Sequence, residues 1–225
     1  MVENHIYPIL PGNIIITRPY EYHHCIYHSD DPHSHFCIWF TSDGNESLFD
    51  LFFERKAGEN NLLSLPEGQK ERALSLCREL AGDDRTELDQ YCGFFELIRL
   101  LGQAKRMDAS DKNYPSDIKF ALNYINSHFA EGFSLQELAE QANVSLNTLE
   151  RHFAEYLRTT PGAYIRSKRL AHSAMLLSQG ANVTEACTES GFSDCSSFIM
   201  YFKKTYGKTP LQYKKKYLLS GEKMV

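Results

Sequence analysis

The sequence predicts an α+β protein that is predominantly helical, with a C-terminal all-α domain of two helix-turn-helix units joined by a linker helix. Three observations support this prediction. Short β-branched segments occur near the start of the chain, helical periodicity begins near residue 67, and the last hundred residues contain an internal repeat. We expect four parts: a β segment (1–66), a helical packing or dimerisation segment (67–107), a linker (108–116) and the double helix-turn-helix domain (117–218).

The composition excludes several classes of protein. Of the 225 residues, 42% are hydrophobic and 24% are charged, which is typical of a globular chain of one large or two modest domains. The longest apolar runs fall far short of the ~20 residues that a membrane span needs, and no signal-peptide pattern is visible at the N-terminus. We therefore expect a cytoplasmic protein with no membrane partner.

Cysteine spacing gives no metal or disulfide framework. The six cysteines, at positions 25, 37, 77, 92, 187 and 195, form no C-x-x-C pair and no zinc spacing. For a cytoplasmic chain this predicts six reduced, mostly buried thiols.

Charge is distributed unevenly along the chain. Residues 1–114 hold 11 basic and 19 acidic residues, a net of −8, whereas residues 115–225 hold 13 and 10, a net of +3. The second part is therefore better suited to a polyanion such as nucleic acid.

The elements before residue 116 follow from local pattern. The β-branched run 13–17 and the run 35–41, which ends at an Asp-Gly turn, predict strands. Apolar residues at three- and four-residue spacing predict helices over 71–80 and 86–107. The apolar surface of the second helix covers more than one face, so it packs either on a partner subunit or across the strand layer. The polar stretch 108–116 contains Pro115 and predicts a linker.

After a predicted helix over 118–129, the sequence repeats itself at a separation of 48–49 residues. Each copy opens with a capping residue and a glutamate three positions later, continues with a small residue inside a short helix, and then has a turn residue that accepts positive φ. A serine cap then begins the next helix. The matched pairs are Ser134 and Asn182, Ala139 and Cys187, Asn143 and Gly191, and Ser145 and Ser193.

Helix, tight turn, helix is the unit that places its second helix in a DNA major groove. The alternative is a pair of helical hairpins that serve only as packing or protein-interaction modules. Between the copies, residues 163–179 predict one helix of roughly 25 Å, which sets two reading heads about one DNA turn, ~34 Å, apart. Its expected inward residues are Tyr164, Leu170, Ala174 and Leu177, and its expected outward residues are Arg166, Lys168 and Arg169.

The C-terminal half resembles the DNA-binding domain of AraC/XylS-type transcriptional regulators. The most specific stretch runs from Gly191 to Phe198 and continues with Phe202-Lys203-Lys204, Gly207, Thr209-Pro210 and Tyr213. The resemblance covers residues 118–217 and implies two helix-turn-helix units that read adjacent major-groove segments of double-stranded DNA.

The resemblance implies base contacts on both reading helices: Asn147, Thr148, Glu150 and Arg151 on the first, and Cys195, Ser196, Ile199 and Met200 on the second. Chemically, Arg151 suits guanine, Asn147 suits adenine, and Glu150 either accepts from cytosine or only pairs with a neighbouring arginine. The family usually has arginine where this chain has Met200, so the second helix offers mainly contacts to thymine methyl groups. Expected phosphate contacts are Arg166, Arg169, Lys203, Lys204 and Lys208, while Lys214-Lys215-Lys216 is either another contact or a solvated helix end.

The segment from Pro11 to His24 resembles the second half of the cupin-like sensor barrel of the same family. We therefore expect an N-terminal partial cupin-like β-barrel followed by two helices, either a natural short form or a barrel whose front part is missing. Six of the nine histidines lie in the first 35 residues, but the H-x-H motif of an earlier strand is absent, so we expect neither a metal nor another cofactor. Expected effector-pocket residues are His24, Trp39, Tyr22 and Tyr27, which are alternatively ordinary core or surface residues.

These observations predict a DNA-binding transcriptional regulator without catalytic residues. We expect an activator, a homodimer, controlled by a sugar-like small-molecule effector and contacting RNA polymerase. The alternatives are an effector-free or truncated regulator that antagonises a full-length relative and, from another class, a cupin-type metalloenzyme that uses the histidine cluster.

Overall fold

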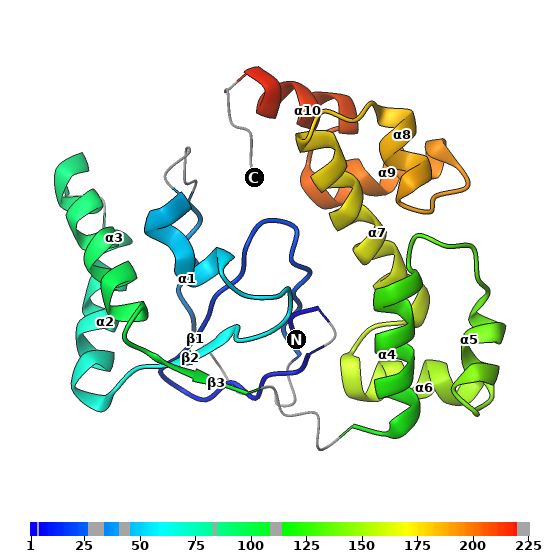
Figure 1. The fold of residues 1–225 in the computed structure, drawn as a ribbon, viewed down its shortest axis with the longest axis horizontal. Coiled ribbons are helices and arrows are strands. Elements are labelled where there is room, and N and C mark those ends of the chain that lie inside the picture. Colours follow the sequence, from blue (N-terminus) through cyan, green and yellow to red (C-terminus); the bar gives the residue numbers. More distant parts are fainter. Residues whose placement is uncertain (4, 27–33, 41–45, 83–84, 109–113, 220–225) are drawn as a thin grey trace.

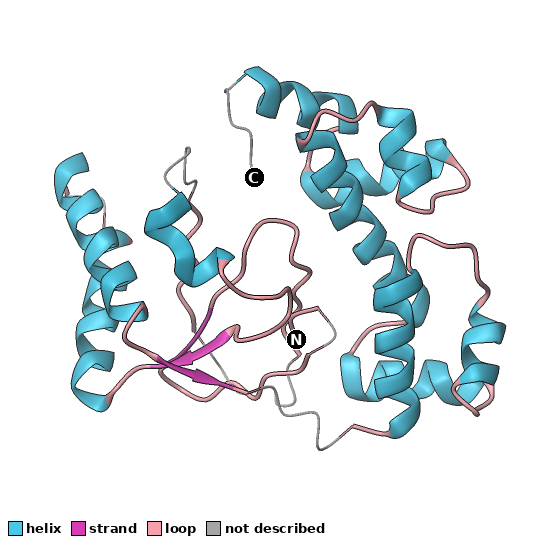
Figure 2. Cartoon of the chain, viewed as in Figure 1, coloured by secondary structure: helices cyan, strands magenta, loops and turns pink. Residues whose placement is uncertain are grey.

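A computed structural model describes residues 1–3, 5–26, 34–40, 46–82, 85–108 and 114–219. Figure 1 shows a small sheet with two helices beside it, and a separate group of helices arranged along the long helix α7. Helices dominate both groups (Figure 2), which confirms the prediction of a mostly helical α+β chain. None of the described helices has the length and apolarity that crossing a bilayer requires.

The sheet has three antiparallel strands in the order β1 (Asn13–Ile15), β2 (Leu62–Ser64) and β3 (Lys105–Met107). Leu63 of the central strand lies opposite Ile14 on one side and Arg106 on the other. The sheet is therefore open, with two edge strands, and the predicted cupin-like half-barrel is not confirmed.

Two predictions for this half of the chain are wrong. Residues 34–40 form no strand, and Thr41 lies outside the described residues. The helix predicted to reach Met107 ends at Leu101, is capped by Gly102 and is followed by β3. Pairing of β3 with β2 supplies hydrogen bonds that local helical periodicity does not anticipate.

One core joins the sheet to the elements around it. These are the 3-10 turn η1 (Glu46–Phe49), α1 (Asp50–Phe53), α2 (Glu67–Leu80) and α3 (Glu87–Leu101). The buried set includes Ile16, Phe49, Phe52, Leu63, Leu76, Leu97, Leu100 and Leu101. Residues on both sides of the predicted boundary at 66–67 thus share one core.

The remaining helices are α4 (Ser116–His128), α5 (Leu135–Gln141), α6 (Leu146–Leu157), α7 (Pro161–Ser178), α8 (Val183–Glu189), α9 (Cys195–Tyr206) and α10 (Pro210–Leu219). We call α5 and α6 the first helix pair, and α8 and α9 the second helix pair. Each pair has its own core. Leu138, Ala139, Leu149 and Phe153 are buried in the first, and Ala186, Cys187, Phe198 and Phe202 are buried in the second.

The predicted caps and turns of the two pairs are confirmed, with one exception. Ser134 and Asn182 both form capping boxes, and Ser145 caps α6. Asn143 and Gly191 have φ of +58° and +80°. In the second pair the cap of α9 is Asp194, which accepts hydrogen bonds from the amides of residues 196 and 197, and not Ser193 as predicted.

The prediction of six reduced, mostly buried cysteines is wrong. Cys187 on α8 and Cys195 at the start of α9 form a disulfide. Cys25, Cys37 and Cys92 are exposed, and Cys77 is half-buried. Spacing alone missed the disulfide because the turn between two helices brings together residues eight positions apart.

The N-terminal segment packs against the first helix pair and α7. Met1 and Ile6 belong to the same buried cluster as Leu138 and Phe153. Lys168, predicted to face outward, is instead buried, and its ammonium pairs with Glu3 and Asn126. A charged residue is stable at this inward position of α7 because carboxylate and amide oxygens satisfy it.

Candidate nucleic-acid interface

Helix α6 presents one apolar face to the core and one polar face to solvent. Leu149, Phe153 and Leu157 are buried. Asn147, Glu150 and Arg151 are exposed, and Thr148 is half-buried with its hydroxyl bonded to the Ser145 hydroxyl at 2.9 Å. The structure therefore brings the four predicted base-contacting residues of α6 together on the solvent side of one helix.

The outer face of α9 is more apolar. Phe198 and Phe202 point into the core, whereas Ile199 is 39% exposed and Met200 is 57% exposed. Ser196 is exposed and its amide donates to the Asp194 carboxylate at 3.0 Å. The sulfur of Cys195 is bonded to Cys187 on α8. The base contact predicted for Cys195 stays a prediction, and in this structure it involves a disulfide sulfur rather than a free thiol.

The predicted phosphate-contacting residues differ in their exposure and in their contacts. Lys203, Lys204 and Lys208 are exposed at the end of α9 and beyond it. The Arg166 guanidinium lies 4.5 Å from the centre of the Tyr201 ring. Arg169 donates to the carbonyl oxygens of Phe129 at 2.6 Å and Glu131 at 3.0 Å, and burial lowers its pKa.

The second helix pair contacts α7 and the segment that precedes the first helix pair. The turn at Gly191 lies so close to the segment after α4 that a Cβ atom there would sit 2.6 Å from the Ala130 carbonyl oxygen. Beside it, His172 of α7 bonds the Ser190 hydroxyl at 3.1 Å and packs its ring edge-on against Phe129. A cavity of about 250 Å³ lies at this junction, lined by Phe133, Leu135, Gly162, Ile165, Arg166, Arg169 and Phe192. These contacts join the second helix pair to α7 and to the segment between α4 and α5.

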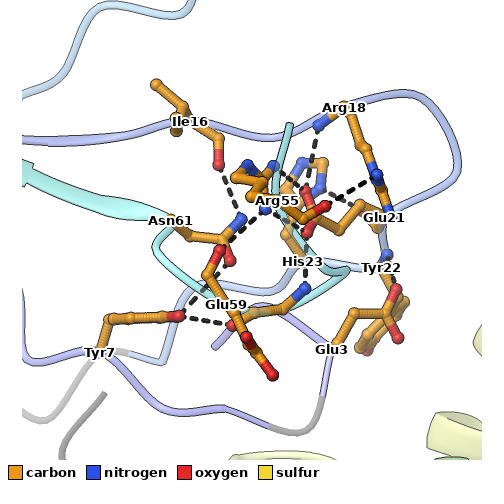
Figure 3. Close-up of polar contacts among 11 residues, drawn as sticks. Glu3, Tyr7, Ile16, Arg18, Glu21, Tyr22, His23, Arg55, Glu59 and Asn61 are labelled. Carbon is orange, nitrogen blue, oxygen red and sulfur yellow. Dashed lines mark hydrogen bonds and ion pairs between the residues drawn. The ribbon is translucent and has the colours of Figure 1, made fainter. Parts of the chain in front are cut away.

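A buried ion pair organises the N-terminal segment (Figure 3). The Arg55 guanidinium bonds both carboxylate oxygens of Glu21, at 2.7 and 2.5 Å, and the Gly58 amide donates to the same carboxylate at 2.7 Å. Burial alone would raise the pKa of Glu21, but these hydrogen bonds outweigh it and hold the pKa below its ordinary value. Glu3 accepts from the Tyr22 amide at 2.7 Å, which links this network to the Lys168 contact.

The predicted effector-pocket residues lie in different surroundings. Trp39 is 82% exposed, and the Tyr22 ring packs edge-on against Tyr164 of α7 at 5.2 Å. His24 is half-buried, and burial lowers its pKa. Tyr27 lies outside the described residues, as do His28 and His33 of the histidine cluster. Because the Trp39 side chain is so exposed, it does not line an enclosed effector pocket in this structure.

Sequence reasoning missed two contacts that position helices α6 and α7. Asp117 of α4 accepts from His152 of α6 at 2.7 Å, which ties α6 to α4. The other is the pairing of Lys168 with Glu3. A signal for the second existed, because Lys168 lies one helical turn after the inward-facing Tyr164.

Comparisons with known proteins agree with this geometry. Residues 138–216 match a protein family described as "Helix-turn-helix domain". The chain is 34% identical over 109 residues to the uncharacterized HTH-type transcriptional regulator YdeC of Bacillus subtilis, an alignment that covers 48% of this chain and 38% of YdeC. It is 30% identical over 118 residues to the HTH-type transcriptional activator RhaS of Escherichia coli, with 52% and 42% covered. The chain thus aligns with less than half the length of these curated relatives.

Among solved structures, a transcriptional regulator with an AraC-type DNA-binding domain from Chromobacterium violaceum is 25% identical, with a TM-score of 0.42. The alignment covers 45% of this chain and 91% of that one. From the family match, residues 138–216 form a helix-turn-helix domain. More particularly, it is an AraC-type domain, which confirms the family resemblance of the sequence.

Proposed function

We propose that the chain is a cytoplasmic, sequence-specific transcriptional activator whose two helix pairs are helix-turn-helix units. Helices α6 and α9 enter successive segments of the major groove of double-stranded DNA. The observation that carries this proposal is that both helices bury apolar residues on one side and leave the predicted contact residues, apart from the disulfide-bonded Cys195, on the other. The 18 residues of α7 span about 27 Å, comparable with the ~34 Å of one DNA turn.

The two helices divide the recognition of DNA between them. Arg151 donates two hydrogen bonds to the edge of a guanine, and Asn147 makes a pair of hydrogen bonds with an adenine. Glu150 accepts a hydrogen bond from the amino group of a cytosine. Ile199 and Met200 contact thymine methyl groups, so the second pair tolerates A·T-rich sequence. Lys203, Lys204 and Lys208 bind phosphate, and Arg166 reaches phosphate from its position over Tyr201. Arg169 contributes less, because its donors already bond two carbonyl oxygens.

The proposal is tested by selecting bound fragments from genomic DNA with the full chain, followed by a salt titration on the best fragment. We expect enrichment of a site with two segments about 10 base pairs apart and binding that falls steeply with salt. Binding that is indifferent to sequence, or no enrichment at all, would leave the helix pairs as protein-interaction modules.

We also propose that the chain forms a homodimer through the outer face of α3. Leu88 is 70% exposed, and Tyr91 and Phe95 follow it on the same face at helical spacing. Sedimentation of the chain is expected to show a dimer, and Leu88→Lys with Tyr91→Lys is expected to give a folded monomer. A dimer that persists in this variant would place the interface elsewhere.

Control by a small molecule would act through the N-terminal segment. The buried pair of Glu3 and Lys168 and the Tyr22–Tyr164 contact connect that segment to α7, so an effector that moves it changes how the domain meets DNA and RNA polymerase. The exposure of Trp39 favours a second candidate, an effector-free regulator. Thermal melting with a panel of sugars separates them, because a ligand that binds only the folded protein raises its melting temperature.

A further inference from the structure

A disulfide joins the two helices of the second helix pair and has no counterpart in the first. The Cα atoms of Cys187 and Cys195 are 5.9 Å apart, within the range that disulfides require. The matching positions of the first pair are occupied by Ala139 and Leu146, which form no such bond. The chain therefore holds one reading unit with a covalent link and one without.

The bond fits the helix pair without altering its turn. In the second pair the Phe192 amide donates to the Cys187 carbonyl at 3.1 Å, and in the first pair the Val144 amide donates to the Ala139 carbonyl at 3.0 Å. The hydrogen bonds that close the two turns, from Gly191 and Asn143, are both 3.0 Å long. The linked form therefore has the same local geometry as the unlinked first pair.

The two cysteines differ in how far they are buried. Cys187 is fully buried beside Phe198 and Phe202, whereas Cys195 is half-buried at the first position of α9. A small oxidant thus reaches Cys195 first, and Cys187 is already in place to complete the bond.

We propose that Cys187 and Cys195 are a reversible oxidation site, which rests on the proposed function because a DNA-binding regulator works in a reducing compartment where disulfides form transiently. The oxidant class is a hydroperoxide. The thiolate of Cys195 attacks one peroxide oxygen, giving a sulfenic acid and, with hydrogen peroxide, water. The sulfur of Cys187 then displaces water to form the disulfide. Overall, two thiols and one hydrogen peroxide give one disulfide and two waters, and a thiol such as glutathione restores both thiols.

Oxidation stabilises the second pair because the bond ties the first turn of α9 to α8. The unfolded chain loses conformational freedom, and the N-terminal end of α9, which carries Ser196, is held as it is in the structure. If α9 is already ordered, it loses less conformational entropy when it binds DNA. The oxidised chain is therefore expected to bind DNA several-fold more tightly than the reduced chain.

The test uses the full chain, reduced and then treated with hydrogen peroxide. Non-reducing peptide mapping is expected to find a Cys187–Cys195 cross-link that glutathione removes, together with a higher melting temperature. The control is Cys187→Ala, which installs the residue of the first pair and is expected to fold, to form no such cross-link and to show no shift in melting temperature.

Absence of the cross-link, or a cross-link that glutathione leaves intact, would overturn the oxidation site. Equal or weaker DNA binding by the cross-linked chain would overturn its regulatory consequence. If neither redox form binds DNA, the proposed function fails, while the cross-link and the melting temperature still decide the oxidation site.

Discussion

The first helix pair and the second helix pair have the same backbone plan and different outer surfaces. Both use a capped short helix, a residue with positive φ and a capped longer helix. The exposed side of α6 carries Asn147, Glu150 and Arg151, whereas that of α9 carries Ile199 and Met200. The two pairs therefore share the positions of their caps and turns and differ in the side chains that they expose.

The largest expected effect comes from the turn of the second pair. Gly191→Ala places a Cβ 2.6 Å from the Ala130 carbonyl oxygen and forces alanine into φ near +80°, which alone costs about 1–2 kcal/mol. We expect the free energy of unfolding to fall by at least about 2 kcal/mol in chemical denaturation.

Gly207→Ala is the matched control, because Gly207 has φ of +70° and a Cβ atom added there would meet nothing within 4 Å. It reports the backbone cost alone. Equal losses for the two variants would show that the Gly191 turn does not lie close to the Ala130 carbonyl oxygen in solution.

The next effect separates base readout in the two pairs. Arg151→Ala is expected to cost about 1–3 kcal/mol in binding to the selected site and to relax the preference at one base pair. Met200→Ala removes only an apolar contact, so its loss is expected to be smaller. Binding measured on the selected site and on its single-base variants checks both. An equal loss on every sequence would contradict the role of Arg151.

A smaller, uniform effect is expected at the end of α9. Lys204→Ala is expected to weaken binding to all sequences alike and to reduce the salt slope by about one. Titration at several salt concentrations measures the slope. A change in base preference instead would place Lys204 at a base edge.

The smallest effect concerns the caps. Asp194 caps α9, and hydrogen bonds from Ser197 and Ser196 lower its pKa, whereas the Ser145 cap of α6 does not titrate in this range. The pKa of Asp194 is lower in the folded chain than in the unfolded chain. The ionised Asp194 carboxylate therefore stabilises the folded chain at pH values above its unfolded pKa of about 3.9, and this stabilisation is lost as the pH falls through its folded pKa.

Asp194→Asn keeps a capping oxygen without the charge and is expected to remove this part of the acid dependence. Helical content followed by circular dichroism between neutral and acidic pH measures it. Identical acid profiles of the variant and the parent chain would rule out Asp194 as the titrating group.

The sequence by itself determined the repeat, the capping boxes of the two helix pairs, both positive-φ turns, and the burial of Tyr164, Leu170, Ala174 and Leu177 on α7. These features depend on contacts within a few residues, so residue type and spacing carry them. The spacing of Leu149 and Phe153 predicted the inward face of α6, whereas its outward contact positions came from the family resemblance.

Only the tertiary structure decided the rest. Residues 105–107 pair with β2 because Leu62–Ser64, distant in sequence, supplies the partner strand. Lys168 is buried because Glu3 reaches it from the other end of the chain, and Cys187 meets Cys195 because a turn folds α9 back on α8. Contacts of this kind depend on where whole elements pack, and local propensity contains no information about the partner that each side chain will find.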